Sequence, residues 1–129
     1  MERITIRTTK PMEVIDITDR VEQIVAKTGI NEGICLVYVP HATSTVIINE
    51  NESNLRKDFL KFFEQLVPKG NWAHNTIDDN AEAHLKSAFF GQGRVLPISN
   101  GKLARGTWQQ IMLCEFDGPR EREVIVLCK

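Results

Sequence analysis

The three histidines of this 129-residue chain are the residues that most clearly suggest chemistry. His74 and His84 enclose the stretch HNTIDDNAEAH, which also contains Asp78 and Asp79, and His41 stands earlier, in PHATST. Each histidine falls at the end of a predicted element, where chain ends can converge. Three imidazoles with a carboxylate behind them would form either a metal site with an open position or an acid–base cluster. The spacing matches no recognised ligand motif, so separate roles as turn, loop and helix-edge residues stay open.

A second polar group follows the predicted strand at 44–50. Asn49 and Glu50 end this strand, and we expect Asn51 to cap the helix that comes next. Turn chemistry explains Asn51 but leaves Glu50 without a structural role. Glu50 is therefore a candidate site residue.

The stretch SNGKLARGT, residues 99–107, has the composition of an anion-binding loop. Its glycines leave backbone N–H groups approachable, and its two basic side chains supply charge. The candidate phosphate contacts are Lys102, Arg105, Gly106 and Thr107. The loop lacks the spacing of a Walker motif, so an ordinary hairpin connection is an equal alternative.

Alternating and helical hydrophobic patterns predict the elements that position these residues. We expect strands 2–8 and 12–18 to form a hairpin, strand 33–40 to pair with strand 44–50, and strands 94–99, 106–116 and 120–129 to close the fold. Three helices lie between them, and the order ββαββααβββ predicts one α+β domain over residues 1–129.

Caps and apolar stripes define the three helices. Asp19 and Gly29 are expected to begin and end the first helix, and Pro68 follows the second. Asp79, with Glu82 three residues later, predicts a capping box at the third. The predicted core stripes are Leu55, Phe59, Phe62, Phe63 and Leu66 in the second helix and Ala81, Leu85, Ala88 and Phe89 in the third, with His84 at the edge.

Composition restricts the classes of function. Apolar residues make up 42% of the chain, which is enough for a core, and 16 basic against 17 acidic side chains give a net charge of −1. We therefore expect no nucleic-acid or membrane partner, and a soluble cytoplasmic protein. Cys35 and Cys114 lie in apolar runs and are expected to be buried thiols without a catalytic role, whereas Cys128 is expected near the surface.

Several motifs together resemble the YjbQ family over nearly the whole chain. They are PHATSTVIINEN, LRKDF, NWAHN, DDNAEAHLK, RVLPI, GKLARGTWQ and the glutamate of LCE, in order and at compatible spacings. The resemblance implies an α+β fold with a β-sandwich and three helices packed on it, a homotrimer, and an associated secondary thiamine phosphate synthase activity.

The resemblance also implies a site. His41, His74 and His84 would gather in one pocket, with Asp79, Asn49 and Glu50 beside them. The turn before the last strand departs from the family pattern, so Arg120 is assigned at most an edge contact. Whether a neighbouring subunit completes the pocket stays open.

The reaction implied by the resemblance joins a hydroxymethylpyrimidine diphosphate to a thiazole phosphate and releases pyrophosphate. The basic loop would bind phosphate, and Glu50 with Asp79 would suit Mg²⁺, whereas three histidines suit Zn²⁺. A divalent metal is therefore expected, and it could be Zn²⁺ or Mg²⁺. Two alternatives are a metal-dependent hydrolase of a phosphorylated metabolite and a non-catalytic trimeric module that binds a metabolite or anion.

Overall fold

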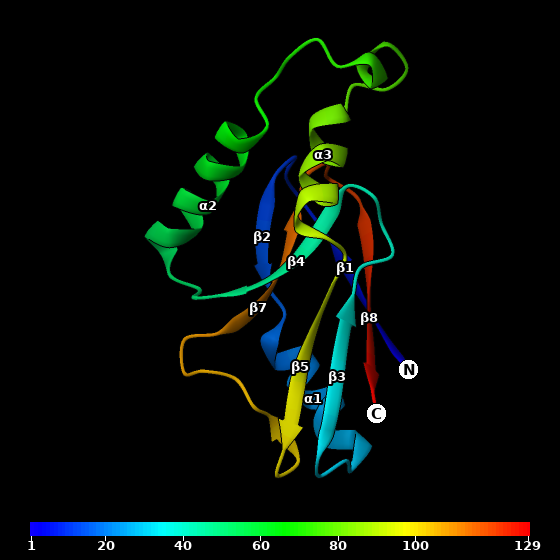
Figure 1. The fold of residues 1–129 in the computed structure, drawn as a ribbon, viewed down its shortest axis with the longest axis vertical. Coiled ribbons are helices and arrows are strands. Elements are labelled where there is room, and N and C mark those ends of the chain that lie inside the picture. Colours follow the sequence, from blue (N-terminus) through cyan, green and yellow to red (C-terminus); the bar gives the residue numbers. More distant parts are fainter.

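The strands form two antiparallel sheets, shown in Figure 1. In the computed structural model, which describes residues 1–129, the first sheet has the order β1 (Glu2–Arg7), β8 (Glu121–Cys128), β3 (Gly33–Tyr38), β5 (Gly93–Ser99) and β6 (Lys102–Leu103). The second has the order β2 (Glu13–Asp16), β7 (Gln110–Glu115) and β4 (Ser44–Asn49). The helices are α1 (Thr18–Thr28), α2 (Ser53–Leu66) and α3 (Ala81–Phe90), and a short 3-10 helix, η1 (Ala73–Thr76), precedes α3. The predicted α+β class is confirmed, and β6 is the only strand that was not expected.

The main core lies between the two sheets. Inward side chains of the five-stranded sheet, such as Val37 and Val126, meet Val46 and Leu113 of the three-stranded sheet. Val21 of α1 joins the same cluster. Burial of these side chains removes a large apolar area from water and provides the main stabilisation of the sandwich.

The other face of the three-stranded sheet carries α2 and α3. Met112 and Cys114 of β7 pack there against Phe63 of α2 and Ala83 of α3. Because Ile111 and Leu113 point into the main core, β7 is buried on both faces. This explains why its sequence, QIMLCE, reads as an unbroken apolar run.

Two predicted strand pairings are wrong. β1 pairs with β8 and β2 with β7, so the expected hairpin does not form; β3 pairs with β5 and β8, and β4 with β7. Hydrophobic alternation shows which face of a strand is buried but does not identify its partner. The connections 8–12, 39–43 and 116–120 each carry the chain from one sheet to the other.

The predicted helix caps also need correction. Asp79 does not cap α3: the amide N–H of Ala81 donates to Asn75 Oδ1 at 2.8 Å, and Asn75 Nδ2 donates to Glu82 at 3.0 Å. Glu52, rather than Asn51, accepts the first N–H groups of α2. Asp19 lies within the first turn of α1, whereas Gly29 ends that helix with φ at +69° as predicted.

The cysteines lie as expected from the sequence. Cys35 and Cys114 are buried, and Cys128 is partly exposed. Burial raises the pKa of the Cys35 thiol to about 12, and the neighbouring Cys128 adds to the effect. Burial likewise raises the pKa of Cys114 to about 12. No helix is long and apolar enough to cross a membrane.

One apolar surface has no cover within the chain. The outer face of the five-stranded sheet and one side of α3 expose large apolar side chains, namely Ile34, Tyr38, Val95, Leu127, Leu85 and Phe89. We call this set the apolar face. The predicted core stripe of α3 is correct for Ala81, which is buried, but wrong for Leu85, Ala88 and Phe89, which face outward. The other buried residues of α3 are Ala83, Lys86 and Ser87.

Candidate functional site

Three of the connections that cross between the sheets, 8–12, 39–43 and 116–120, meet at one end of the sandwich, around a buried ion pair. Arg122 Nε donates to the two carboxylate oxygens of Glu115 at 2.9 and 3.1 Å, and both side chains are almost fully buried. Thr8 donates to Glu115 at 2.7 Å, and Arg122 donates to the Thr43 hydroxyl at 2.8 Å. One residue from each of the first two connections is thus held against β7 and β8.

The charged form of Glu115 is stabilised in the fold. Burial alone would raise the pKa of this carboxyl, but hydrogen bonds from Arg122, Thr8 and the Asp117 backbone outweigh burial and leave the pKa lowered. The carboxylate and the guanidinium therefore form a fixed buried unit. Histidines and polar residues are arranged around this unit.

His41 is held in one tautomer by the neighbouring strand. The backbone N–H of Glu123 donates to His41 Nε2 at 3.0 Å, so the proton of the neutral ring lies on Nδ1. Burial lowers the pKa of His41, and the positive charge of Arg122 lowers it further, partly offset by Glu123 and Glu115. His41 is thus a neutral ring that offers an N–H donor.

In His74 the proton of the neutral ring lies on the other nitrogen, Nε2. Asn80 Nδ2 donates to the Asp117 carboxylate at 2.8 Å, so Asn80 Oδ1 faces His74 Nε2, which lies 2.9 Å away. A carboxylate can only accept, so this amide orientation makes His74 the donor through Nε2–H and leaves the Nδ1 lone pair free. Arg120 binds Asp117 at 2.9 Å and completes the chain of contacts. Arg120 thus contributes more than the edge contact that the sequence suggested.

His84 connects the two other histidines. Its ring meets that of His74 edge to face, with 4.9 Å between the ring centroids. It also lines a cavity of about 620 Å³ with His41. We call this cavity the histidine pocket; its other lining residues are Tyr38, Pro40, Ala42, Leu85, Ser87, Ala88 and Gln92.

The side chains of one chain do not fit the predicted metal site. No three histidine, cysteine, aspartate or glutamate side chains are grouped so that they could hold an ion. In addition, the Nε2 atoms of His41 and His74 already have hydrogen-bond partners. The structure therefore brings the histidines together as neighbours, and a metal at this place would need a ligand set that one chain does not provide.

The other predicted site residues lie elsewhere. Asn49 is the last residue of β4 and Glu50 follows it, roughly 17 Å of strand away from the end beside His41. Asn49 Oδ1 accepts the N–H of Glu50 at 2.8 Å. Asp79 is exposed and lines a different cavity, on the other side of α3. One chain therefore does not place these three residues in the histidine pocket.

The basic loop 99–107 is also remote from the histidines. It follows the far end of β5, roughly 20 Å of strand from Gln92. Gly101, Lys102, Arg105, Gly106 and Thr107 line a separate cavity of about 710 Å³, together with Asp19 and Glu22 of the first helical turns.

Much of the charge of this loop is already paired. Arg105 forms an ion pair with Glu22 at 2.7 Å and donates to Gln109 O at 2.8 Å. The N–H of Gly106 donates to the Gln109 side chain at 2.8 Å. Lys102 is the basic side chain of the loop that forms no ion pair.

Several residues of the site had no role assigned from the sequence, although Asn80 and Glu115 stand in the family motifs. Asn80 and Asp117 orient His74, and Arg122 with Glu115 fixes the strand that binds His41. Asn80 reads as part of a helix start, and Arg122 lies in the charged stretch REREV, which is typical of a solvated strand end. Their roles depend on contacts between elements that are distant in the sequence.

Comparison with known proteins identifies close relatives. A family profile described as UPF0047 protein YjbQ-like matches residues 2–128. A UPF0047 protein of Archaeoglobus fulgidus is 50% identical over 124 residues, which cover 95% of this chain and 96% of that protein. UPF0047 protein YugU of Bacillus subtilis is 42% identical over 126 residues, which cover 95% of this chain and 93% of that protein.

Solved structures share the fold. A YbjQ-like protein of unknown function from Sulfolobus solfataricus aligns with a TM-score of 0.95 at 50% identity, covering 97% of this chain and 92% of that chain. An uncharacterised YjbQ/UPF0047 family protein of Clostridium acetobutylicum aligns with a TM-score of 0.95 at 35% identity, and the alignment covers 100% of both chains.

Proposed function

This chain belongs to the YjbQ-like UPF0047 family, and we propose that it is an enzyme that acts on a phosphorylated small molecule in the histidine pocket. One observation carries the proposal: the two imidazoles on either side of His84 have their tautomers fixed in opposite senses. His41, which lines the histidine pocket with His84, offers Nδ1–H, and His74, whose ring meets that of His84, offers a free Nδ1 lone pair. A hydrogen-bond donor and a proton acceptor on the two sides of His84 suit acid–base catalysis.

The reaction that we propose for this pocket is thiamine phosphate synthesis. The thiazole nitrogen forms a C–N bond with the pyrimidine methylene carbon, and the C–O bond to pyrophosphate breaks. Negative charge then grows on the leaving group. There the Nδ1–H of His41 can donate, and His84, whose ring makes no hydrogen bond within the chain, can bind an oxyanion. The chemistry needs positioning of two rings, which a cavity of about 620 Å³ has room for.

We also propose that the chain assembles as a homotrimer through its apolar face. The register places Leu36 opposite both Val95 and Leu127, so the outward residues of three adjacent strands form one surface. Contiguous apolar surface of this kind on a soluble protein marks an interaction site. Tyr38 and Leu85 belong both to this face and to the histidine pocket, so a second copy packed there would close the pocket.

A shared site would reconcile the histidines with the basic loop. The two lie at opposite ends of β5 in one chain, so a substrate in the histidine pocket would meet Lys102 only from another subunit. The same holds for Asn49, Glu50 and any divalent metal, Zn²⁺ or Mg²⁺, because one chain lacks the ligand set. We propose that the functional unit is the assembly rather than the single chain.

The test is a steady-state assay of thiamine phosphate and pyrophosphate formation with the parent, His84→Gln and His41→Gln. Glutamine keeps hydrogen-bonding capacity but does not exchange protons near neutral pH. Asp79→Asn is the matched control, since Asp79 is exposed and lies outside the histidine pocket. We expect kcat losses of about 100-fold or more for the histidine variants and a parental rate for the control.

Mixing two inactive variants tests the shared site. If His84→Gln and Lys102→Gln chains are refolded together, assemblies that contain one intact histidine pocket beside one intact loop should regain part of the activity. No recovery would contradict sharing. Binding of pyrophosphate that depends on His84, without any product from the parent, would favour the non-catalytic binding module and overturn the enzyme proposal.

A further inference from the structure

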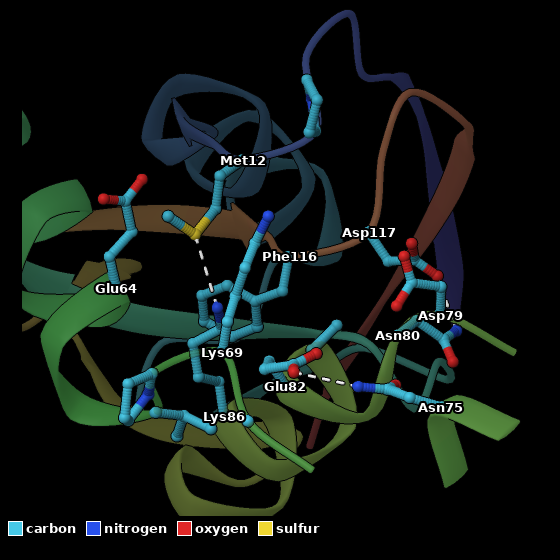
Figure 2. A pocket seen from close by; sticks show the side chains of 15 residues that line it. Met12, Glu64, Lys69, Asn75, Asp79, Asn80, Glu82, Lys86, Phe116 and Asp117 are labelled. Atoms are coloured by element: carbon cyan, nitrogen blue, oxygen red, sulfur yellow. Dashed lines mark hydrogen bonds between the residues drawn. The ribbon is translucent and has the colours of Figure 1, made fainter. Parts of the chain in front are cut away.

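A second cavity, separate from the histidine pocket, lies on the opposite side of α3. Its volume is about 850 Å³, within the range of small-molecule sites. Figure 2 shows it between the end of α2, the first turns of α3, Met12 and Phe116. His84 and Lys86 are two positions apart, which is about 200° around a helix, so the two side chains enter different cavities.

Lys86 is a buried amine without a charged partner. Its exposed fraction is 6%, and none of the ion pairs of the chain includes it. The hydrogen-bond partner of Nζ is the thioether sulfur of Met12 at 3.7 Å, and Figure 2 shows this contact. The Phe116 ring centroid lies 5.4 Å from Nζ.

This environment does not satisfy an ammonium group. An ammonium has three N–H donors, and a thioether is a weak acceptor. The aromatic ring provides a cation–π contact of modest strength. A lysine with a purely structural role at such burial would be paired with a carboxylate, as Arg122 is paired with Glu115.

The surroundings make the ammonium form of Lys86 less stable than that of a solvated lysine. Burial lowers the pKa of Lys86, and the carboxylates of Glu82 and Glu64 oppose this effect only in part. A neutral amine has a nucleophilic lone pair, and desolvated lysines next to apolar side chains are the ones that form Schiff bases with carbonyl compounds.

We propose that Lys86 is a reactive amine that forms an imine with a small aldehyde or ketone bound in this cavity. The proposal does not depend on the function of the histidine pocket. It rests on the buried, unpaired Nζ at the wall of a cavity that has room for a ligand.

The step is balanced without any redox partner. The Nζ lone pair forms a C–N bond to the carbonyl carbon while the C=O π bond opens, and a proton moves from nitrogen to oxygen to give a carbinolamine. Loss of water then gives the imine. The proton that an ammonium releases before the attack passes to solvent, which reaches this cavity beside the exposed Lys69.

The charges of the cavity wall indicate the class of ligand. Glu64, Asp79, Glu82 and Asp117 line the cavity, whereas Lys69 is the basic side chain other than Lys86. Because acidic groups outnumber basic ones, an uncharged or cationic carbonyl compound fits better than an anionic one.

Reductive trapping tests the proposal on the folded parent protein. Glycolaldehyde is added at neutral pH with cyanoborohydride, which reduces any imine to a stable secondary amine, and modified peptides are mapped by mass spectrometry at increasing times. Lys69 is the internal control, because it is an exposed lysine at the same cavity. We expect Lys86 to be modified before Lys69 and before the other exposed lysines.

Two variants and a second probe complete the experiment. Lys86→Arg should lose the early modification entirely, whereas Lys69→Arg should keep it. Glyoxylate, which is anionic, should modify Lys86 more slowly than glycolaldehyde does; equal rates would overturn the charge preference. Modification of Lys69 ahead of Lys86 in the parent would overturn the reactive amine, and this comparison needs no variant to fold.

Discussion

Arg122→Met is the substitution with the most predictable effect on stability. It removes the guanidinium and leaves the Glu115 carboxylate, with 0% exposure, bound only by the Thr8 hydroxyl and the Asp117 N–H. Breaking one side of a buried ion pair costs about 3–5 kcal/mol because the remaining charge is uncompensated. For a domain of this size, that loss corresponds to a fall in Tm of roughly 10–20 °C.

The pH dependence of this variant gives an independent check. In the parent, the pKa of Glu115 is lowered below its ordinary 4.5, so its stabilisation is present above that pH and is lost as pH falls through the folded pKa. Without Arg122, burial raises the pKa of Glu115 instead. The folded variant then binds a proton that the unfolded chain has released, so its stability deficit should shrink between pH 7 and pH 5.

Urea unfolding at several pH values measures both effects. Arg3→Met is the control. Arg3 and Glu123 form an ion pair with an N–O distance of 2.8 Å, but both side chains are exposed, and exposed pairs contribute at most about 1 kcal/mol to the free energy of unfolding. The reasoning is refuted if Arg122→Met loses less than about 1 kcal/mol at pH 7, or if its deficit is the same at pH 5 as at pH 7.

Three further predictions concern a cap, the thiols and the assembly. Asn75→Ala should lower the free energy of unfolding by about 1 kcal/mol through the lost contact with the Ala81 N–H, whereas Asp79→Ala should leave urea unfolding unchanged. A thiol reagent at pH 8 should modify Cys128 in the folded protein and leave the two buried thiols unreacted until urea unfolds the chain. Leu127→Asp should shift the mass in light scattering from a trimer towards the 14.7 kDa chain, and a trimeric variant would show that this part of the apolar face is not the interface.

The sequence predicted the elements better than their partners. Strand and helix positions follow from local hydrophobic periods, which is why all of the expected elements appear close to their predicted bounds. Strand pairing depends on where the chain passes from one sheet to the other, and a hydrophobic period carries no information on this. The segment around Lys10 and Pro11 has the sequence of a hairpin turn, but it leads from one sheet to the other. The apolar stripe of α3 was found correctly and assigned to the wrong place, since Leu85 and Phe89 face outward.

The candidate site was predictable only in part, because local sequence patterns locate the ends of elements but not the contacts between distant elements. His41, His74 and His84 stand at element ends, and these ends do lie together. Asn80 and Asp117 could not be identified, because their contact with each other joins residues 37 positions apart. Asp79 illustrates the opposite error: its position suited a capping box, but Asn75, in the preceding 3-10 helix, accepts the N–H of Ala81, and Asp79 makes no cap bond.

The most direct test of the histidine pocket is a long-range ¹H–¹⁵N spectrum of the imidazoles, recorded at pH 7 with and without pyrophosphate. The chain has only three histidines, so each can be assigned by substitution. We predict that His41 carries its proton on Nδ1 and His74 on Nε2, and that pyrophosphate shifts the signals of His41 and His84. A His41 ring protonated on Nε2, or imidazole signals that pyrophosphate leaves unmoved, would contradict the proposed site.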